Sequence, residues 1–189
     1  MPTLRSDPET ASPLTALVYP DAGYPVAAFE ALVARCRRHG LSLAGVLQHV
    51  SDATPDRRCD VILEDLSTGL RSAIFENRGA GASSCRLDES ALTGVAVRIA
   101  SALESAPDVL VLNKFGKAEC EGRGLRHLIA VALDREIPVL IGVPKGNLSA
   151  WRGFTGDLGT EIEAEVGEIE RWAERLRPSA AVSAGLIAE

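Results

Sequence analysis

Short, continuous apolar runs alternate along the chain with segments whose apolar residues recur at helical spacing. Four of the runs are long enough to form one buried strand each: 14–20, 41–50, 108–113 and 137–144. Apolar residues three and four positions apart mark four further segments: 29–36, 92–103, 125–133 and 161–177. Apolar strands that alternate with helices predict a doubly wound α/β fold, a mostly parallel sheet with helices on both faces.

A more polar segment, "CDVILEDLSTGLRSAIFEN" at 59–77, interrupts this alternation. Its two alternating stretches around a turn at 67–69 predict a small antiparallel flank of the sheet. The cluster of Cys59, Asp60, Glu64 and Asp65 is compatible with a metal or polar site, and equally with a half-exposed strand. The whole arrangement predicts one α/β domain at 13–178, with a flexible arm at 1–12 and a tail at 179–189.

Charge and composition narrow the function classes. The 189 residues carry a formal net charge of −6, whereas general nucleic-acid binding requires a basic footprint, so no nucleic-acid partner is expected. No apolar run approaches the roughly 20 residues of a membrane span, and no apolar signal core is visible, so we expect a cytoplasmic protein without membrane insertion. The four cysteines and three histidines lack metal-ligand spacing, and we expect no metal site.

The loop "NKFGKAECEGRGLR" at 113–126 is the first candidate site, because it follows the strongest strand signal and carries four cations against two glutamates. Lysines and forked guanidinium groups at a strand end can close on an oxyanion or a phosphate. Glycines permit a close approach of the backbone to a ligand. A solvated loop held by its own salt bridges is the alternative. The candidate ligand-binding residues of this loop are Asn113, Lys114, Gly116, Lys117, Arg123 and Arg126.

A glycine-rich loop, "ENRGAGASSCRLDES" at 76–90, is the second candidate. Backbone amides, hydroxyls and guanidinium groups are all hydrogen-bond donors, so this loop also suits an anion. The candidates are Arg78, Ser83, Ser84 and Arg86. A surface loop that ends in a helix cap at Asp88 is the alternative.

The turn after the first predicted strand, "YPDAGYPVAAF" at 19–29, occupies the place of a phosphate-binding loop in nucleotide-binding α/β proteins. Such a loop carries a lysine followed by serine or threonine, for the phosphates and for Mg²⁺. This turn contains none of these residues, although the amides of a helix N-terminus can still attract an anion.

Several segments together are similar to a bacterial family, domain of unknown function 2478: "GLSLAGVLQH", "CDVILEDLSTG", "CRLD", "LVLNKFGKAECEGRGLR" and "IPVLIGVP". The resemblance extends over nearly the whole chain after Pro13, and "NKFGK-x-E-x-E-GRG-x-R" is its most specific motif. Members often bear the name molybdenum-transport ATP-binding protein. The resemblance therefore implies a nucleotide or molybdate as ligand and a link with molybdenum metabolism.

The order of elements also resembles the small nucleoside-triphosphatase family related to P-loop kinases. In that layout, residues 24–26 stand where a phosphate loop has Gly-Lys-Thr. Asn113 and Lys114 stand where a strand end carries an acidic pair, the metal-binding acid and the catalytic glutamate, while Gly116, Lys117 and Glu119 of that motif are kept. The resemblance implies a P-loop NTPase-like fold with a degenerate phosphate loop.

Three functions follow as hypotheses. The first is a non-catalytic or regulatory protein that binds a small anion, either an oxyanion or a nucleotide phosphate. The second is a nucleoside-triphosphate hydrolase with an atypical site, in which Glu119 is catalytic. The third is a module that binds a partner protein through the mixed charges of the loop.

Overall fold

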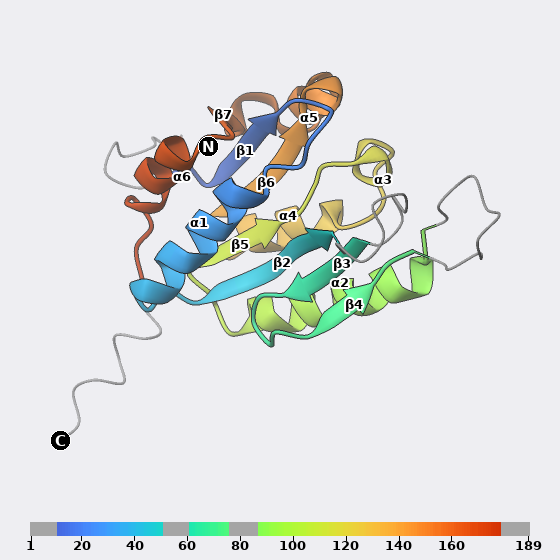
Figure 1. Ribbon diagram of the computed structural model, residues 1–189, viewed down its shortest axis with the longest axis horizontal. Coiled ribbons are helices and arrows are strands. Elements are labelled where there is room, and N and C mark those ends of the chain that lie inside the picture. Colours follow the sequence, from blue (N-terminus) through green and yellow to red (C-terminus); the bar gives the residue numbers. More distant parts are fainter. Residues whose placement is uncertain (1–10, 51–60, 76–86, 179–189) are drawn as a thin grey trace.

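The strands form one sheet in the computed structural model, which describes residues 11–50, 61–75 and 87–178. Among these residues, seven strands pair in the order β4-β3-β2-β5-β6-β1-β7 (Figure 1). The strands are β1 (Leu14–Tyr19), β2 (Leu43–Val50), β3 (Val61–Asp65), β4 (Arg71–Ala73), β5 (Val109–Leu112), β6 (Val139–Pro144) and β7 (Thr160–Glu163). The five strands from β2 to β7 in this order run parallel, whereas β3 and β4 are antiparallel. The predicted mostly parallel sheet and its antiparallel flank are confirmed.

Helices cover both faces of the sheet, as the hydrophobic pattern predicts. They are α1 (Val26–Arg38), α2 (Glu89–Glu104), α3 (Lys117–Cys120), α4 (Arg126–Asp134), α5 (Leu148–Thr155) and α6 (Val166–Ala173). Helices α1 and α6 pack together on the near face in Figure 1, while α2 and α4 lie on the far face. Asp88 caps α2 as predicted, because its carboxylate accepts a hydrogen bond from the Ala91 amide at 2.9 Å.

Two apolar layers hold the helices on the sheet. The layer under α1 and α6 contains the fully buried Phe29 and Leu32, and the layer under α2, α4 and α5 contains the fully buried Phe115 and Trp151. The rings of Phe115 and Trp151 meet edge to face, with centroids 5.4 Å apart. This contact fixes the start of the 113–126 loop in the core.

The predicted helix at 161–177 is wrong in its first part. Residues 160–163 form β7, which pairs in parallel with the outer edge of β1, and α6 starts only at Val166. Ile162 packs against the α1–α6 layer, while Glu161 and Glu163 alternate with it on the other side. Pairing with the free edge of β1 therefore decides the structure of a segment whose apolar residues also fit helical spacing.

The close approach of β2 to β5 requires a residue without a side chain at position 45, which is a glycine. Its φ is +107°, and a Cβ there would lie 1.8 Å from the carbonyl oxygen of Val111 on β5. We expect Gly45→Ala to lower the free energy of unfolding by at least about 3 kcal/mol, because the change strains the backbone and separates two central strands.

Chemical denaturation of two purified variants checks this. Gly153→Ala is the control, since Gly153 lies in helix α5 and a Cβ at this position would have no atom within 4 Å. It is expected to leave stability unchanged or slightly raised. Equal stabilities for the two variants would contradict the close approach of β2 to β5.

Candidate functional site

The chain reverses its direction of winding between β1 and β6. Helix α1 follows β1 on one face of the sheet, and α5 follows the neighbouring β6 on the other face (Figure 1). In open α/β sheets, a crevice forms outside the carboxyl ends of two such strands, and ligands bind there. The carboxyl edge at β1, β6 and β5 is therefore the place where a site is expected.

Three loops meet at this edge through hydrogen bonds. The carboxylate of Asp21, after β1, accepts a bond from the Gly146 amide, after β6, at 2.8 Å. The side-chain amide of Asn147 donates to the carbonyl of Phe115, after β5, at 2.7 Å. Neither bond is visible in the sequence, because each joins loops far apart along the chain. The two bonds tie the turn at 20–25 and the start of the 113–126 loop to the same short helix, η1 (Lys145–Asn147).

Asn113 lies at the end of β5, beside β2. Its side-chain amide donates to the Oε1 atom of Gln48 at 2.9 Å, while its own Oδ1 atom is buried and has no hydrogen-bond partner within residues 11–50, 61–75 and 87–178. Lys114 follows it and is exposed. Among the described residues, Lys114 forms no ion pair, so its ammonium group is available to a ligand at this edge.

The other cations of the loop form ion pairs or a ring contact with neighbouring side chains. Lys117, with a side chain 90 % exposed, lies 3.9 Å from the carboxylate of Glu121, which Arg123 also contacts. Arg126 stacks on the ring of Phe154, with its guanidinium carbon 4.0 Å from the ring centroid. The structure thus brings Asn113, Lys114 and the loop backbone to the carboxyl edge, whereas three predicted cations are engaged within the loop or on α5.

Glu119 is the residue that shapes this loop. One carboxylate oxygen accepts a hydrogen bond from the Gly116 amide at 2.9 Å, and the other accepts one from the Leu125 amide at 3.0 Å. Glu119 is only 7 % exposed, and a Cβ at Gly124 would lie 2.1 Å from one of its oxygens. The positive φ angles of Gly122 and Gly124 let the chain fold around this carboxylate. The spacing of Glu119 three residues after Gly116 is the signal that identifies this role, as in the acidic half of a capping box.

Tyr19, at the end of β1, and Tyr24, in the turn at 20–25, are not among the predicted ligand-binding residues. The ring of Tyr24 stacks on Phe29, with centroids 5.2 Å apart, and meets Tyr19 edge to face at 6.0 Å. Burial, followed by the charge of Asp21, raises the pKa of Tyr19 far above its ordinary value. Burial raises the pKa of Tyr24 as well, and the nearby backbone of Gln48 lowers it less. Both phenols are therefore protonated at neutral pH.

The second candidate loop lies outside the described residues, and so do Arg78, Ser83, Ser84 and Arg86. Cys59 and Asp60 lie outside them too. Within the described part of the chain, no group of three or more histidine, cysteine or acidic side chains is arranged to hold a metal ion. No helix there is long and apolar enough to cross a membrane.

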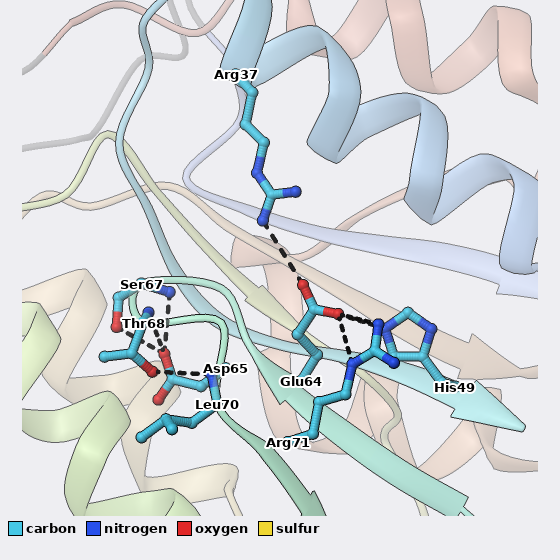
Figure 2. Close-up of polar contacts among 8 residues, drawn as sticks. All are labelled: Arg37, His49, Glu64, Asp65, Ser67, Thr68, Leu70 and Arg71. Atoms are coloured by element: carbon cyan, nitrogen blue, oxygen red, sulfur yellow. Dashed lines mark hydrogen bonds and ion pairs between the residues drawn. The ribbon is translucent and has the colours of Figure 1, made fainter. Parts of the chain in front are cut away.

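Glu64 and Asp65 of β3 point to opposite faces of the flank, as their spacing predicts (Figure 2). The Oε2 atom of Glu64 lies 2.8 Å from His49 Nε2 and accepts a bond from Arg71 Nη2 at 3.1 Å. Burial alone would raise the pKa of Glu64, but the bonds from Arg71 and His49 outweigh it and hold the pKa below its ordinary value. On the other face, Asp65 accepts bonds from the amide and the hydroxyl of Ser67, within the hairpin turn. These contacts indicate that both carboxylates stabilise the flank.

The comparisons with known proteins define the class first. The fold is P-loop NTPase-like, as predicted: the chain aligns with the crystal structure of THEP1 from the hyperthermophile Aquifex aeolicus with a TM-score of 0.56. The alignment covers 85 % of this chain and 94 % of the other, at 13 % sequence identity. At that identity the likeness establishes the architecture alone.

The family follows from the sequence. Residues 14–172 match the model described as "Protein of unknown function (DUF2478)", and the chain belongs to this family. A relative, "Molybdenum import ATP-binding protein ModC 2" of Bradyrhizobium diazoefficiens, is 39 % identical over 138 residues. The match covers 71 % of this chain but spans only 15 % of the length of that relative. The predicted family resemblance is thereby confirmed.

Glu119→Ala tests the role of this carboxylate in the loop. The change removes the acceptor of two backbone amides, and each buried amide left without a partner costs about 1–3 kcal/mol. We expect a loss of about 2–4 kcal/mol in the free energy of unfolding, measured by urea denaturation. Glu121→Ala, which breaks only exposed ion pairs on the same loop, is the matched control and should change stability little. Similar losses for both variants would contradict the buried role of Glu119.

The lowered pKa of Glu64 predicts how stability depends on pH. Because this pKa is lower in the folded than in the unfolded state, the stabilisation is complete above the unfolded value of about 4.3 and is lost as the pH falls below it. Glu64→Gln should therefore lose less stability than the wild type between pH 7 and pH 3.5. Urea unfolding midpoints at the two pH values provide the measurement, and an identical loss in both proteins would refute the prediction.

Proposed function

We propose that the chain is a binding or regulatory protein that holds an oxyanion or a nucleotide phosphate at the carboxyl edge of β1, β6 and β5. The observation that carries the proposal is Lys114, an exposed cation without an ion pair among the described residues. It lies beside Asn113 at the ligand-binding edge of a P-loop NTPase fold. The proposed ligand-binding residues remain those of the two loops: Asn113, Lys114, Gly116, Lys117, Arg123, Arg126, Arg78, Ser83, Ser84 and Arg86.

The contacts of the cations in the 113–126 loop indicate how readily each of them can bind an anion. Lys114 contributes most to binding, because among the described residues it forms no ion pair that an anion would have to break. Lys117 and Arg123 are held by Glu121 in exposed ion pairs. Such pairs contribute little to stability, so a ligand can recruit either cation with little loss of stability. Arg126 stacks on the Phe154 ring and must leave it to reach a ligand, so it ranks last among these cations.

The arrangement favours binding over hydrolysis. Phosphoryl transfer relies on a metal ion, a phosphate-loop lysine and a residue that positions the attacking water. The strand end offers Asn113 and Lys114 in place of an acidic pair, and the turn at 20–25 has no lysine. Both oxygens of Glu119 are occupied by backbone amides within the loop. The degenerate phosphate loop is part of this proposal.

The identity of the ligand is proposed from the relative. Its name describes an ATP-binding protein for molybdenum import, and the part shared with this chain is a small fraction of it. A nucleotide and molybdate are therefore the two ligands to compare, together with simpler anions. A role in the cytoplasm, linked to molybdenum metabolism, completes the proposal.

Calorimetric titration with ATP, GTP, phosphate, molybdate and tungstate tests the function. At least one of these anions should bind, and Lys114→Ala should weaken its affinity about tenfold, because a charge-assisted hydrogen bond is lost. Arg171→Ala is the control, since Arg171 pairs with Glu168 on α6, and it should bind like the wild type.

Two results would overturn the proposal. One is the absence of binding across the panel of anions. The other is unchanged affinity in Lys114→Ala. Mg²⁺-dependent release of phosphate from ATP or GTP by the wild-type chain would replace the binding function with the hydrolytic alternative.

A further inference from the structure

Three buried polar atoms that have no hydrogen-bond partner in the described part of the chain lie near the carboxyl ends of β1 and β5. They are the hydroxyls of Tyr19 and Tyr24 and the Oδ1 atom of Asn113. The two other such atoms among the described residues, on Asp65 and Arg98, face each other at 3.5 Å in an ion pair far from this edge. Buried polar groups in proteins nearly always have partners, so three together require an explanation.

Gly142 on β6 is the point at which these residues meet. A Cβ there would lie 2.6 Å from the Asn113 carbonyl oxygen and 3.2 Å from the Tyr19 ring. The ring of Tyr24 lies against Tyr19, and its hydroxyl lies near the backbone of Gln48 without forming a bond of good geometry. Gln48 in turn accepts the side-chain bond of Asn113. These contacts bring the three residues together near Gly142, at the carboxyl ends of β1, β6, β5 and β2.

We propose that Tyr19, Tyr24 and Asn113 form the inner end of the anion site and recognise hydrogen phosphate in preference to molybdate or tungstate. This inference rests on the proposed function of the carboxyl edge and names its ligand class. The phenols, which are protonated, donate hydrogen bonds to phosphate oxygens, and Lys114 supplies the positive charge at the rim.

The preference for hydrogen phosphate follows from the groups near the proposed ligand that can accept a hydrogen bond but cannot donate one. The Oδ1 atom of Asn113 can only accept a hydrogen bond, so the ligand must bring a proton. The negative charge of Asp21, close enough to Tyr19 to raise its pKa, also disfavours a ligand that lacks one. Hydrogen phosphate keeps a proton at neutral pH, whereas molybdate and tungstate are fully ionised. A free phosphate ion has this chemistry, whereas a singly esterified phosphate, such as the terminal phosphate of a nucleotide, loses its last proton at about pH 6 and is mostly without it at pH 7.

The hydroxyls of Tyr19 and Tyr24 are buried, so a ligand reaches them only if the turn between the two residues moves. Asp21, Ala22 and Gly23 are exposed, and Gly23 has a φ of +106°, which favours glycine. The hydrogen bond between Asp21 and Gly146 joins the tip of this turn to η1. A ligand that supplies partners to the two phenols favours the displaced position of the turn.

Tyr19→Phe and Tyr24→Phe test the inference by two measurements on each protein. Each change removes a hydroxyl that has no hydrogen-bond partner among the described residues and keeps the ring. The thermal midpoint (Tm) of the ligand-free protein should therefore stay the same or rise, while the affinity for phosphate falls about tenfold. Thr15→Val is the matched control, because the Thr15 hydroxyl, on the same strand as Tyr19, accepts a bond from Trp172 at 3.0 Å. It should lower Tm and leave phosphate affinity unchanged.

A lower Tm with unchanged phosphate affinity in both tyrosine variants would overturn the inference, because the hydroxyls would then be structural. If Lys114→Ala still weakened binding in that case, the proposed function would stand without this inner end. Absence of anion binding by the wild type would overturn both.

Selectivity provides the second measurement. Wild-type protein at pH 7 should bind inorganic phosphate at least about tenfold more tightly than molybdate or tungstate. Asn113→Leu, which removes the acceptor, should bring the ratio of affinities close to one. Equal or tighter binding of molybdate by the wild type would overturn the assignment of phosphate. Titration with ATP distinguishes the free ion from a nucleotide: tighter binding of phosphate supports the inference, whereas tighter binding of ATP would overturn the assignment of hydrogen phosphate and leave the proposed function in place.

Discussion

The parallel pairing of β6 with both β1 and β5 is the constraint on which the rest of the structure depends. It places the carboxyl ends of three strands side by side, and with them the turn at 20–25, the short helix η1 and the 113–126 loop. The reversal of winding between β1 and β6 then opens this edge, because the helices that follow the two strands leave on opposite faces. Every contact of the candidate site, from Asp21 to Asn147, follows from this arrangement.

The residues of the charged loop after β5 have two different roles: some fix the shape of the loop, and others form ion pairs at its surface. Glu119 and the glycines at 122 and 124 build its shape, since one buried carboxylate binds both ends of the loop. Lys117 and Arg123 neutralise Glu121 at its surface. Lys114 alone among the lysines of this loop has no such partner among the described residues. The dense charge of this strand end is thus mostly structural, and it leaves one cation available to a ligand.

The sequence predicts the layers of the fold well because burial imposes periodicity on each element separately. The strands at 14–19 and 109–112 and the capped helix at 89–104 can all be identified from local patterns. The strand β7 cannot, because Ile162, Val166 and Ile169 also fit helical spacing, and only the distant edge of β1 selects the strand.

The same limit applies to the site. The charges of Lys114 and Lys117 are visible in the sequence, but the bond of Asp21 to Gly146 joins residues that no local pattern connects. Tyr19 could not be identified from the sequence for a different reason. An aromatic residue at the end of an apolar strand predicts core packing, and only the structure shows that its hydroxyl is buried and has no hydrogen-bond partner among the described residues.

The amide resonances of the chain test anion binding at the carboxyl edge most directly. Titration of isotope-labelled protein with phosphate should shift the amides of the three loops that meet there, at positions 21, 114 and 146, and leave those at 108 and 137, at the amino ends of β5 and β6, unmoved. Shifts confined to the amino edge, or none at any concentration of phosphate or ATP, would contradict anion binding at the carboxyl edge.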